Sequence, residues 1–254
     1  MVVAGAPIRL ARVSHRFDLH GQPLPVLEAI DLTAEPGEFI ALLGPSGCGK
    51  STLLRLIAGL ERPYAGRILM NDQLIEAPDP SRILVFQDPT LFPWRTVRQN
   101  VALGLETRGV LRSEGSRVDA VLRQVGLDGF DNAYPRQLSG GMAQRAALAR
   151  ALVNEPRVLL MDEPLANLDS LTRIGMQSEL TALWQRRRFT AFMVTHDVEE
   201  ALYMAGRVLV LSQRPASILA EITVDLPYPR HRGSREFAAL RERLMEELGL
   251  QSQW

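Results

Sequence analysis

The residues best placed to do chemistry stand together in one short segment, GPSGCGKST, which fits the spacing G-x-x-x-x-G-K-[ST]. Glycines let successive backbone N–H groups turn inward around phosphate oxygens, and a helix that follows adds the positive end of its dipole. Lys50 would reach the β- and γ-phosphates of a nucleotide, and the Ser51 hydroxyl would bind Mg²⁺. The expected phosphate-binding residues are Gly44, Pro45, Ser46, Gly47, Cys48, Gly49, Lys50, Ser51 and Thr52.

A second pair of reactive side chains ends an apolar run, VLLMDEP, at residues 158–164. This pattern places Asp162 and Glu163 at the carboxyl end of a buried strand, where open α/β sheets bind their ligands. We expect Asp162 to hold Mg²⁺, directly or through water, and Glu163 to polarise the attacking water. Alone, the two acids would equally suit a charged strand end, but together with the phosphate loop they predict a nucleotide site.

Lys50 is the only lysine among the 29 basic residues of this 254-residue chain. A bias toward arginine explains the other positions, whereas a compact ammonium on a flexible stem suits a phosphate cradle better than a planar guanidinium does. The 29 acidic residues bring the formal net charge to zero. Because bulk binding to nucleic acid needs a basic footprint, we expect no nucleic-acid partner.

The composition is that of a folded globular protein, with 46% hydrophobic and 23% charged residues. The single cysteine, Cys48, excludes an internal disulfide, fits a reducing compartment, and is expected to be a small side chain of the loop. No apolar run approaches the ~18 to 20 residues that span a bilayer. The first residues lack the basic and long apolar regions of a signal peptide, so a cytoplasmic protein is expected.

The phosphate loop needs a strand before it and a helix after it, and the sequence supplies both. Residues 38–43 are strongly apolar, and the apolar residues of 51–60 recur at helical spacing, with Gly59 near the expected helix end. Further strands are expected at residues 8–13 and 27–35, with turn signals at 21–25 and 36–37. Others are expected at 67–70, 83–86, 158–161, 189–194 and 208–211, and the last four resemble strands of a parallel sheet.

The pattern changes twice along the chain. Between residues 88 and 156 it becomes helical, with segments at 97–105, 116–125 and 142–153. After residue 215 a short strand at 219–225 precedes the segment LPYPRHR and an amphipathic helix at 236–248. We therefore expect an α/β nucleotide-binding core at 1–87 and 157–215, a helical subdomain at 88–156, and a tail of one strand and one helix at 216–254.

A third motif, LSGGM, occupies residues 138–142, about 20 residues before the DEP segment. With a phosphate loop, a helical insert, LSGG and DEP in this order, the chain resembles the ATP-binding subunits of ABC transporters over essentially its whole length. The resemblance implies a P-loop NTPase (RecA-like) core with an N-terminal antiparallel β subdomain and an inserted helical subdomain. It also implies an ATP hydrolase coupled to transmembrane solute transport, with ATP and Mg²⁺ as cofactors.

In that family two subunits pair head to tail, and ATP lies between the phosphate loop of one and the signature motif of the other. Ser139, Gly140 and Gly141 are the signature residues here, and donors at a helix start suit a γ-phosphate. On its own, SGG is also a common turn. The resemblance thus implies a second copy of this chain as a partner.

The resemblance implies roles for four further residues. Gln87 resembles the glutamine that senses Mg²⁺ and water and faces the transmembrane partner, and His196 resembles the switch histidine at the γ-phosphate. Asp169 resembles the aspartate of the dimer contact, and Phe17 the aromatic residue that stacks on adenine. Phe17 would also suit an ordinary core position, and a lone histidine is often structural. The implied catalytic residues are Lys50, Gln87, Glu163 and His196, and the implied metal ligands are Ser51, Gln87 and Asp162.

Three positions depart from the pattern of the family. Phe17 replaces the commoner tyrosine and still stacks, but it lacks the hydroxyl. Met142 stands where glutamine is most frequent, so one polar contact of the signature is missing. Ala166 lacks the hydroxyl of a frequent serine, which puts fine coupling between subunits in doubt, although no catalytic group is removed.

The chain looks like an importer subunit of the nitrate, sulfonate and taurine subgroup, on the stretch TLFPWRTVRQNVALGLE, on Met142, and on the tail LPYPRHRGSREFAALRERLMEEL. Members that import pyrimidine precursors, bicarbonate or aromatic acids read very similarly, and this subunit never touches the cargo. The resemblance implies integral membrane permease subunits and, indirectly, a periplasmic or extracellular solute-binding protein as partners. It also implies a peripheral location on the cytoplasmic face of the inner membrane.

Residues 91–94 are apolar and follow the Q-loop, the segment that contains Gln87, and we predict that they help to dock a coupling helix of the permease. They would also suit the core of the helical subdomain. Two other functions remain open at this point. One is a soluble ABC-type ATPase of a non-transport assembly or regulatory complex, and the other is a P-loop kinase, which would not need LSGG, the Q-loop or the switch histidine.

Overall fold

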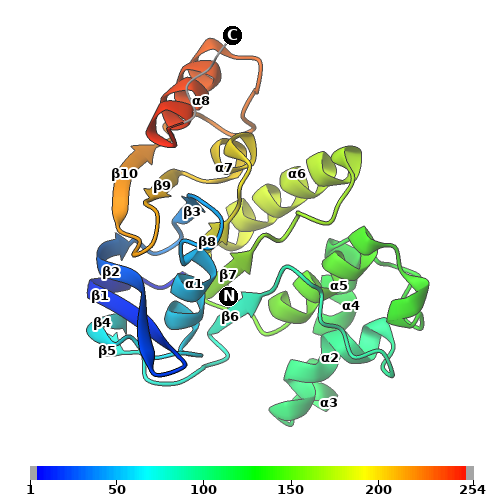
Figure 1. The fold of residues 1–254 in the computed structure, drawn as a ribbon. Coiled ribbons are helices and arrows are strands. Elements are labelled where there is room, and N and C mark those ends of the chain that lie inside the picture. The colour runs from blue at the N-terminus through cyan, green and yellow to red at the C-terminus, as the bar shows by residue number, and fades with distance from the viewer. Residues whose placement is uncertain (1–4, 250–254) are drawn as a thin grey trace.

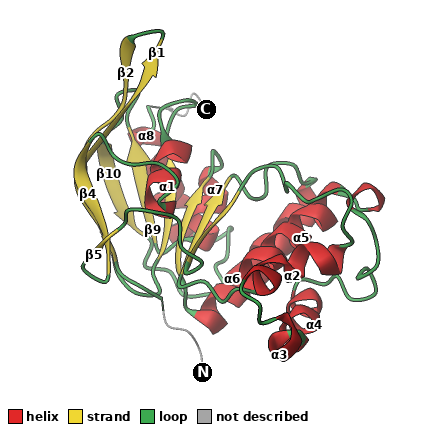
Figure 2. Cartoon of the chain, turned by 90° about the horizontal axis from the view of Figure 1, so that it is seen from below, coloured by secondary structure: helices red, strands yellow, loops and turns green. Residues whose placement is uncertain are grey.

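The structure is a computed structural model that describes residues 5–249. The outermost ends of the predicted core and tail, residues 1–4 and 250–254, lie outside the described residues. Two β-sheets stand side by side, and a separate group of helices lies to one side of them (Figures 1 and 2). Among residues 5–249, no helix combines the length and the apolar character needed to cross a bilayer.

The larger sheet has six strands in the order β10-β9-β3-β8-β7-β6. Five of them run parallel, and β10 is antiparallel to β9. The central strands are buried on both faces, as the continuous apolar runs predict. The parallel sheet is thus confirmed, with strand bounds β3 Phe39–Leu43, β6 Arg82–Val85, β7 Val158–Asp162, β8 Thr190–Val194, β9 Arg207–Leu211 and β10 Ile218–Thr223.

The smaller sheet is antiparallel, in the order β2-β1-β4-β5, with β1 Ile8–Leu19, β2 Gln22–Ala34, β4 Ala65–Met70 and β5 Gln73–Leu74. The predicted strands at 8–13 and 27–35 were too short. The hairpin turn takes only His20 and Gly21, both with positive φ, and β2 continues through Pro23 and Pro25. Prolines are tolerated there because β2 is an edge strand, where a missing N–H need not interrupt a ladder.

The helices divide into three groups. Helix α1 (Lys50–Ala58) follows β3 and ends at Gly59, as predicted. The inserted group packs α2 on α5, with the bounds α2 Val97–Thr107, α3 Leu111–Glu114, α4 Ser116–Gln124, a 3-10 turn Pro135–Gln137 and α5 Gly140–Leu152. The last three helices are α6 Ser170–Arg187, α7 Val198–Met204 and α8 Arg235–Glu247.

Helix α6 has no counterpart among the segments predicted from the sequence. Its buried face includes the polar residues Gln177 and Thr181, while the apolar Leu171 and Ile174 are exposed. Because of this mixture, apolar residues that recur every three or four positions do not mark a single face, and that repeat is the signal from which a helix is predicted.

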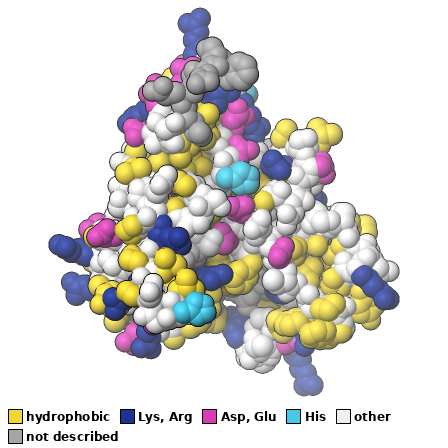
Figure 3. All heavy atoms as spheres, in the orientation of Figure 1, with side chains coloured by type: hydrophobic (Ala, Val, Ile, Leu, Met, Phe, Trp, Pro, Cys, Tyr) yellow, Lys and Arg dark blue, Asp and Glu magenta, His cyan; other side chains and the backbone are white. Residues whose placement is uncertain are grey.

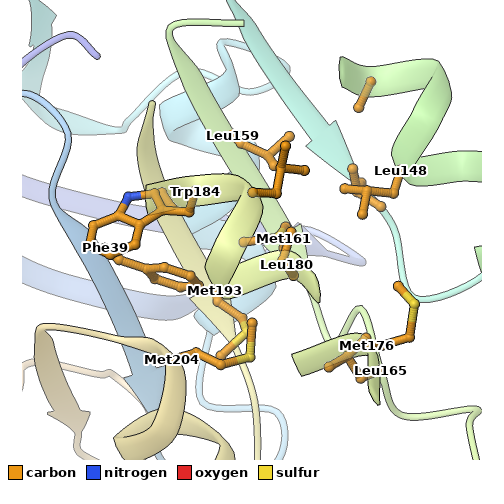
Figure 4. Close-up of a cluster of buried hydrophobic side chains, with 14 of the residues drawn as sticks. Phe39, Leu148, Leu159, Met161, Leu165, Met176, Leu180, Trp184, Met193 and Met204 are labelled. Atoms are coloured by element: carbon orange, nitrogen blue, oxygen red, sulfur yellow. The ribbon is translucent and has the colours of Figure 1, made fainter. Parts of the chain in front are cut away.

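Two hydrophobic cores cover the two faces of the parallel sheet. One packs α1 and the antiparallel sheet against it, and the other joins it to α6, α7, α8 and the inserted helices. In the second core the rings of Phe39 and Trp184 meet edge to face with centroids 5.6 Å apart (Figure 4). The core of the sheet therefore fixes the positions of the loops at the strand ends.

The tail is anchored to α7 by a buried arginine. Arg230 is only 5% exposed, and its guanidinium donates hydrogen bonds to the carbonyls of Leu202 at 2.6 Å and Val224 at 3.0 Å. It also donates to Ala205 O beyond the end of α7, and the Tyr228 hydroxyl donates to Met204 O at 2.8 Å. Burial lowers the pKa of Arg230. The segment between β10 and α8 thus closes the carbonyl end of α7.

Arg230→Met should destabilise the protein by about 2 to 4 kcal/mol, because several buried carbonyls lose their donor. Urea unfolding measures the change, and Arg243→Met on the exposed face of α8 is the control, expected within about 0.5 kcal/mol of wild type. Equal stability of the Arg230 variant would show that the anchor contributes nothing.

Candidate functional site

The carboxyl ends of the parallel strands open into a cavity of about 330 Å³. Most of the predicted phosphate-binding residues line it, as do Phe17, Gln87 and Glu163. The full lining is Phe17, Val26, Ser46, Gly47, Gly49, Lys50, Ser51, Thr52, Gln87, Glu163, Val194 and Arg214. Segments far apart in the sequence therefore meet around one space.

The phosphate loop takes its shape from backbone conformations that favour glycine. Gly49 precedes α1 with φ 119°, and a Cβ there would lie 2.7 Å from Val26 Cγ1. Lys50 is buried, and its Nζ donates hydrogen bonds of 2.8 Å to the carbonyls of Gly44 and Pro45. Cys48 is buried too, with its Sγ 3.9 Å from Nζ. The ammonium is thus held inside the loop by neutral acceptors.

Ser51 and Asp162 are brought together across 111 positions of sequence, with Ser51 Oγ donating to Asp162 Oδ1 at 2.9 Å. Burial raises the pKa of Asp162, the Ser51 hydrogen bond opposes this, and the charge of Glu163 adds to it.

Oxygen donors from Ser51, Asp162 and Gln87 are the ligands that Mg²⁺ prefers, so the residues fit this ion. No cluster of three or more His, Cys, Asp or Glu side chains suited to a metal occurs within residues 5–249. A bound Mg²⁺ would therefore complete its shell with phosphate and water.

Glu163 and His196 lie next to each other. His196 Nδ1 is 3.4 Å from Glu163 Oε2, and the histidine is the more exposed of the two, at 68% against 26%. Glu163 has φ 45° and its N–H donates to Val194 O at 3.0 Å, which ties its backbone to the end of β8. Both residues line a second cavity of about 10 Å³.

The signature residues and Asp169 are placed apart from this cavity. Ser139 caps α5 by accepting from Met142 N at 3.3 Å, and Asp169 caps α6 by accepting from Thr172 N at 3.0 Å. A Cβ on Gly141 would lie 3.0 Å from the Thr172 side chain, so the two helix starts adjoin. Ser139, Gly140, Gly141 and Asp169 thus form a group of their own, outside the lining of the phosphate-loop cavity.

Phe17 lies at the cavity rather than in the core. It is 38% exposed, and its ring meets the edge of His15 with centroids 4.9 Å apart. Three lining residues were missed by the sequence analysis, namely Val26, Val194 and Arg214. For Val194 and Arg214 a signal existed, since each stands at or after the carboxyl end of a predicted strand.

A phosphate loop, a strand-end acid pair and a histidine at one edge of a parallel sheet define a P-loop nucleotide hydrolase. Residues 27–166 match the family described as ABC transporter. An uncharacterized ABC transporter ATP-binding protein of Methanocaldococcus jannaschii is 44% identical over 95% of this chain and 91% of its own length. The aliphatic sulfonates import ATP-binding protein SsuB of Bacillus licheniformis is 46% identical over 87% of this chain and 86% of its own length.

The fold has a close solved counterpart. A dimeric structure of a post-hydrolysis state of the ATP-binding cassette MJ0796, bound to ADP and Pi, aligns with a TM-score of 0.76 and 30% identity. The alignment covers 87% of this chain and 100% of that one. The chain belongs to the ABC transporter family and is an ATP-binding, ATP-hydrolysing cassette.

Asp162→Asn should stabilise the nucleotide-free protein at neutral pH. Because the pKa of Asp162 is raised in the folded state, its contribution to stability is present below the unfolded pKa and is lost as pH rises through the folded pKa. The stability gap between variant and wild type, measured by urea unfolding, should therefore shrink toward about pH 4.

Asp169→Asn is the matched control, because hydrogen bonds from Thr172 lower the pKa of Asp169. That carboxylate contributes stability above its unfolded pKa, so its replacement should bring no gain at neutral pH. A gap for Asp162→Asn that stays constant with pH would contradict the effect of burial.

Proposed function

We propose that this chain is the ATP-hydrolysing subunit of an importer that takes up a small anionic solute of the sulfonate, nitrate or taurine kind. The observation that carries the ATPase part is that Lys50, Ser51 and Glu163 line one cavity, with Asp162 hydrogen-bonded to Ser51. The similarity to a sulfonate import protein supports the solute class.

The proposed roles follow from the geometry. Lys50 neutralises the β- and γ-phosphates, and Glu163 accepts a proton from the attacking water. His196, 3.4 Å from Glu163, orients the water and contacts the γ-phosphate. Ser51, Asp162 and Gln87 would hold Mg²⁺, which would supply charge neutralisation at the phosphates.

The adenine end and the second subunit complete the proposed site. Phe17 stacks on the adenine ring. Ser139, Gly140 and Gly141 act on the nucleotide of a second copy of the chain, with Asp169 at the contact between copies. Their separation from the cavity of their own chain supports this head-to-tail arrangement.

We also propose that three parts of the chain have different roles. They are a core at 1–87 and 157–215, a helical subdomain at 88–156 and a tail at 216–254. The helical part would meet integral membrane permease subunits at the cytoplasmic face of the inner membrane, with a solute-binding protein as an indirect partner and no role for nucleic acid.

The proposed docking surface comprises residues 91–94 and the neighbouring cavity of about 230 Å³ between β6, α2 and α5. Trp94 is 70% exposed and packs on Phe92 with ring centroids 5.2 Å apart, so it is a surface residue rather than part of the helical core. Arg150 donates to Pro89 O at 3.0 Å and Thr90 O at 2.9 Å, and so fixes the start of this segment on α5. In Figure 3, hydrophobic side chains gather on the part of the surface where Figure 1 places the inserted helices α2 to α5.

Glu163→Gln should reduce ATP turnover about 100-fold or more, since a general base contributes this much, while ATP affinity stays near that of wild type. A nucleotide-bound dimer should accumulate, measured by light scattering.

Lys50→Ala should lose ATP binding, and Glu242→Gln on exposed α8 is the neutral control for both variants. Near-normal ATP turnover of Glu163→Gln would contradict the role of Glu163 as general base. Unchanged ATP affinity of Lys50→Ala would contradict the assignment of residues 44–52 as the phosphate-binding loop.

Trp94→Ala should weaken assembly with the permease about tenfold or more, as the loss of an exposed aromatic anchor does at interfaces. ATP hydrolysis by the isolated subunit should not change. Co-purification with co-expressed permease subunits measures assembly, and Tyr64→Ala, 61% exposed just before β4, is the control. Intact assembly and intact transport-linked ATPase activity would contradict the docking role.

A further inference from the structure

The loop between β9 and β10, residues 212–217, begins beside the phosphate loop. The parallel register pairs Leu43 with Val210, so Gly44 and Leu211 follow as neighbours at the carboxyl edge of the sheet. A Cβ on Gly44 would lie only 2.8 Å from Leu211 O. The two loops therefore leave the sheet in close contact.

The far end of the same loop is bonded to β2. Ala216 N donates to Val26 O at 2.8 Å, and Glu28 N donates to Ala216 O at 2.9 Å. Within the loop, Ser217 N donates to Ser212 Oγ at 2.9 Å. Figure 1 shows β9 and β10 on the same side of the molecule as β2 and β1. The loop is thus held between β2, which carries the lining residue Val26, and the phosphate loop.

Arg214 stands in the middle of this loop and lines the 330 Å³ cavity. Its guanidinium has no hydrogen bond, ion pair or ring contact to any residue in the range 5–249 that the structure describes. The other basic residue that lines the cavity is Lys50, whose ammonium is already bonded to backbone carbonyls. An arginine without a protein partner therefore faces a space that the proposed function assigns to a polyphosphate.

We propose that Arg214 binds the nucleotide through its α-phosphate. This inference rests on the proposed ATP site. The side chain of Val26 packs on Gly49 at the start of α1, and Ala216 of the Arg214 loop is hydrogen-bonded to Val26. Arg214 lines the cavity together with Phe17, Val26 and Gly49. In a nucleotide the α-phosphate lies between the base, which would stack on Phe17, and the β- and γ-phosphates, which would lie at Lys50; Arg214 lines the same cavity as both residues. The planar fork of a guanidinium suits a phosphate oxygen pair.

Arg214→Gln should raise the Kd of both ATP and ADP about fivefold, as expected for a charged hydrogen bond that solvent partly screens. The KM for ATP should rise by the same factor, and kcat should stay within about twofold, because the contact does not involve the γ-phosphate. Arg214→Lys should be intermediate. Arg62→Gln removes an equal charge from an exposed loop outside the cavity and should leave both affinities unchanged. Competition with a fluorescent nucleotide measures Kd.

The proposal is overturned if Arg214→Gln binds ATP and ADP as wild type does, or if Arg62→Gln loses as much affinity. A loss for ATP that ADP does not share would place the contact on the γ-phosphate and overturn the α-phosphate assignment. If Lys50→Ala abolishes ATP binding while Arg214→Gln does not weaken it, the proposed role of Arg214 is wrong but the proposed ATP site stands. If the wild-type chain binds no ATP, the proposed function fails together with it.

Discussion

The parallel pairing of β3, β7 and β8 is the constraint on which the rest of the molecule depends. These strands are buried on both faces, so the chain can present polar groups to a ligand only where they end. The register pairs Val194 with both Leu42 and Asp162, which aligns the three strand ends. The loops after these strands therefore leave the sheet side by side, and they carry the phosphate loop, the acids Asp162 and Glu163, and His196. The hydrophobic core thereby determines the geometry of the polar site.

Burial also determines the electrostatics of that site. Within residues 5–249 the Lys50 ammonium forms no ion pair with a carboxylate, and its hydrogen bonds go to the carbonyl oxygens of Gly44 and Pro45. Asp162 likewise bonds a hydroxyl rather than a cation, and burial raises its pKa. The Lys50 ammonium and the Asp162 carboxylate thus lie in the same site without forming an ion pair with each other. Both therefore stay available to a ligand that carries phosphates on one side and a metal ion on the other.

The sequence was informative wherever a signal is local. The phosphate loop, α1 with its end at Gly59, and the apolar parallel strands depend on neighbouring residues, and the structure has them where they were predicted. The extent of β1 and β2 was underestimated because prolines in an edge strand look like a turn. Helix α6 was missed because its buried face is partly polar. Arg214 follows the carboxyl end of a predicted strand, which is a signal for a site at that edge of the sheet, but its place in this cavity depends on contacts of its loop with β2 and the phosphate loop that are distant in sequence.

The two prolines of β2 have a consequence for how copies of the chain can associate. Pro23 and Pro25 stand at the outer border of the antiparallel sheet, where each removes an N–H that another strand would need. That border is a poor template for strand addition, so a neighbouring molecule gains little by extending the sheet. The cassette is protected at this border from open-ended β-association, so contacts between copies fall to its helix starts and loops rather than to this strand.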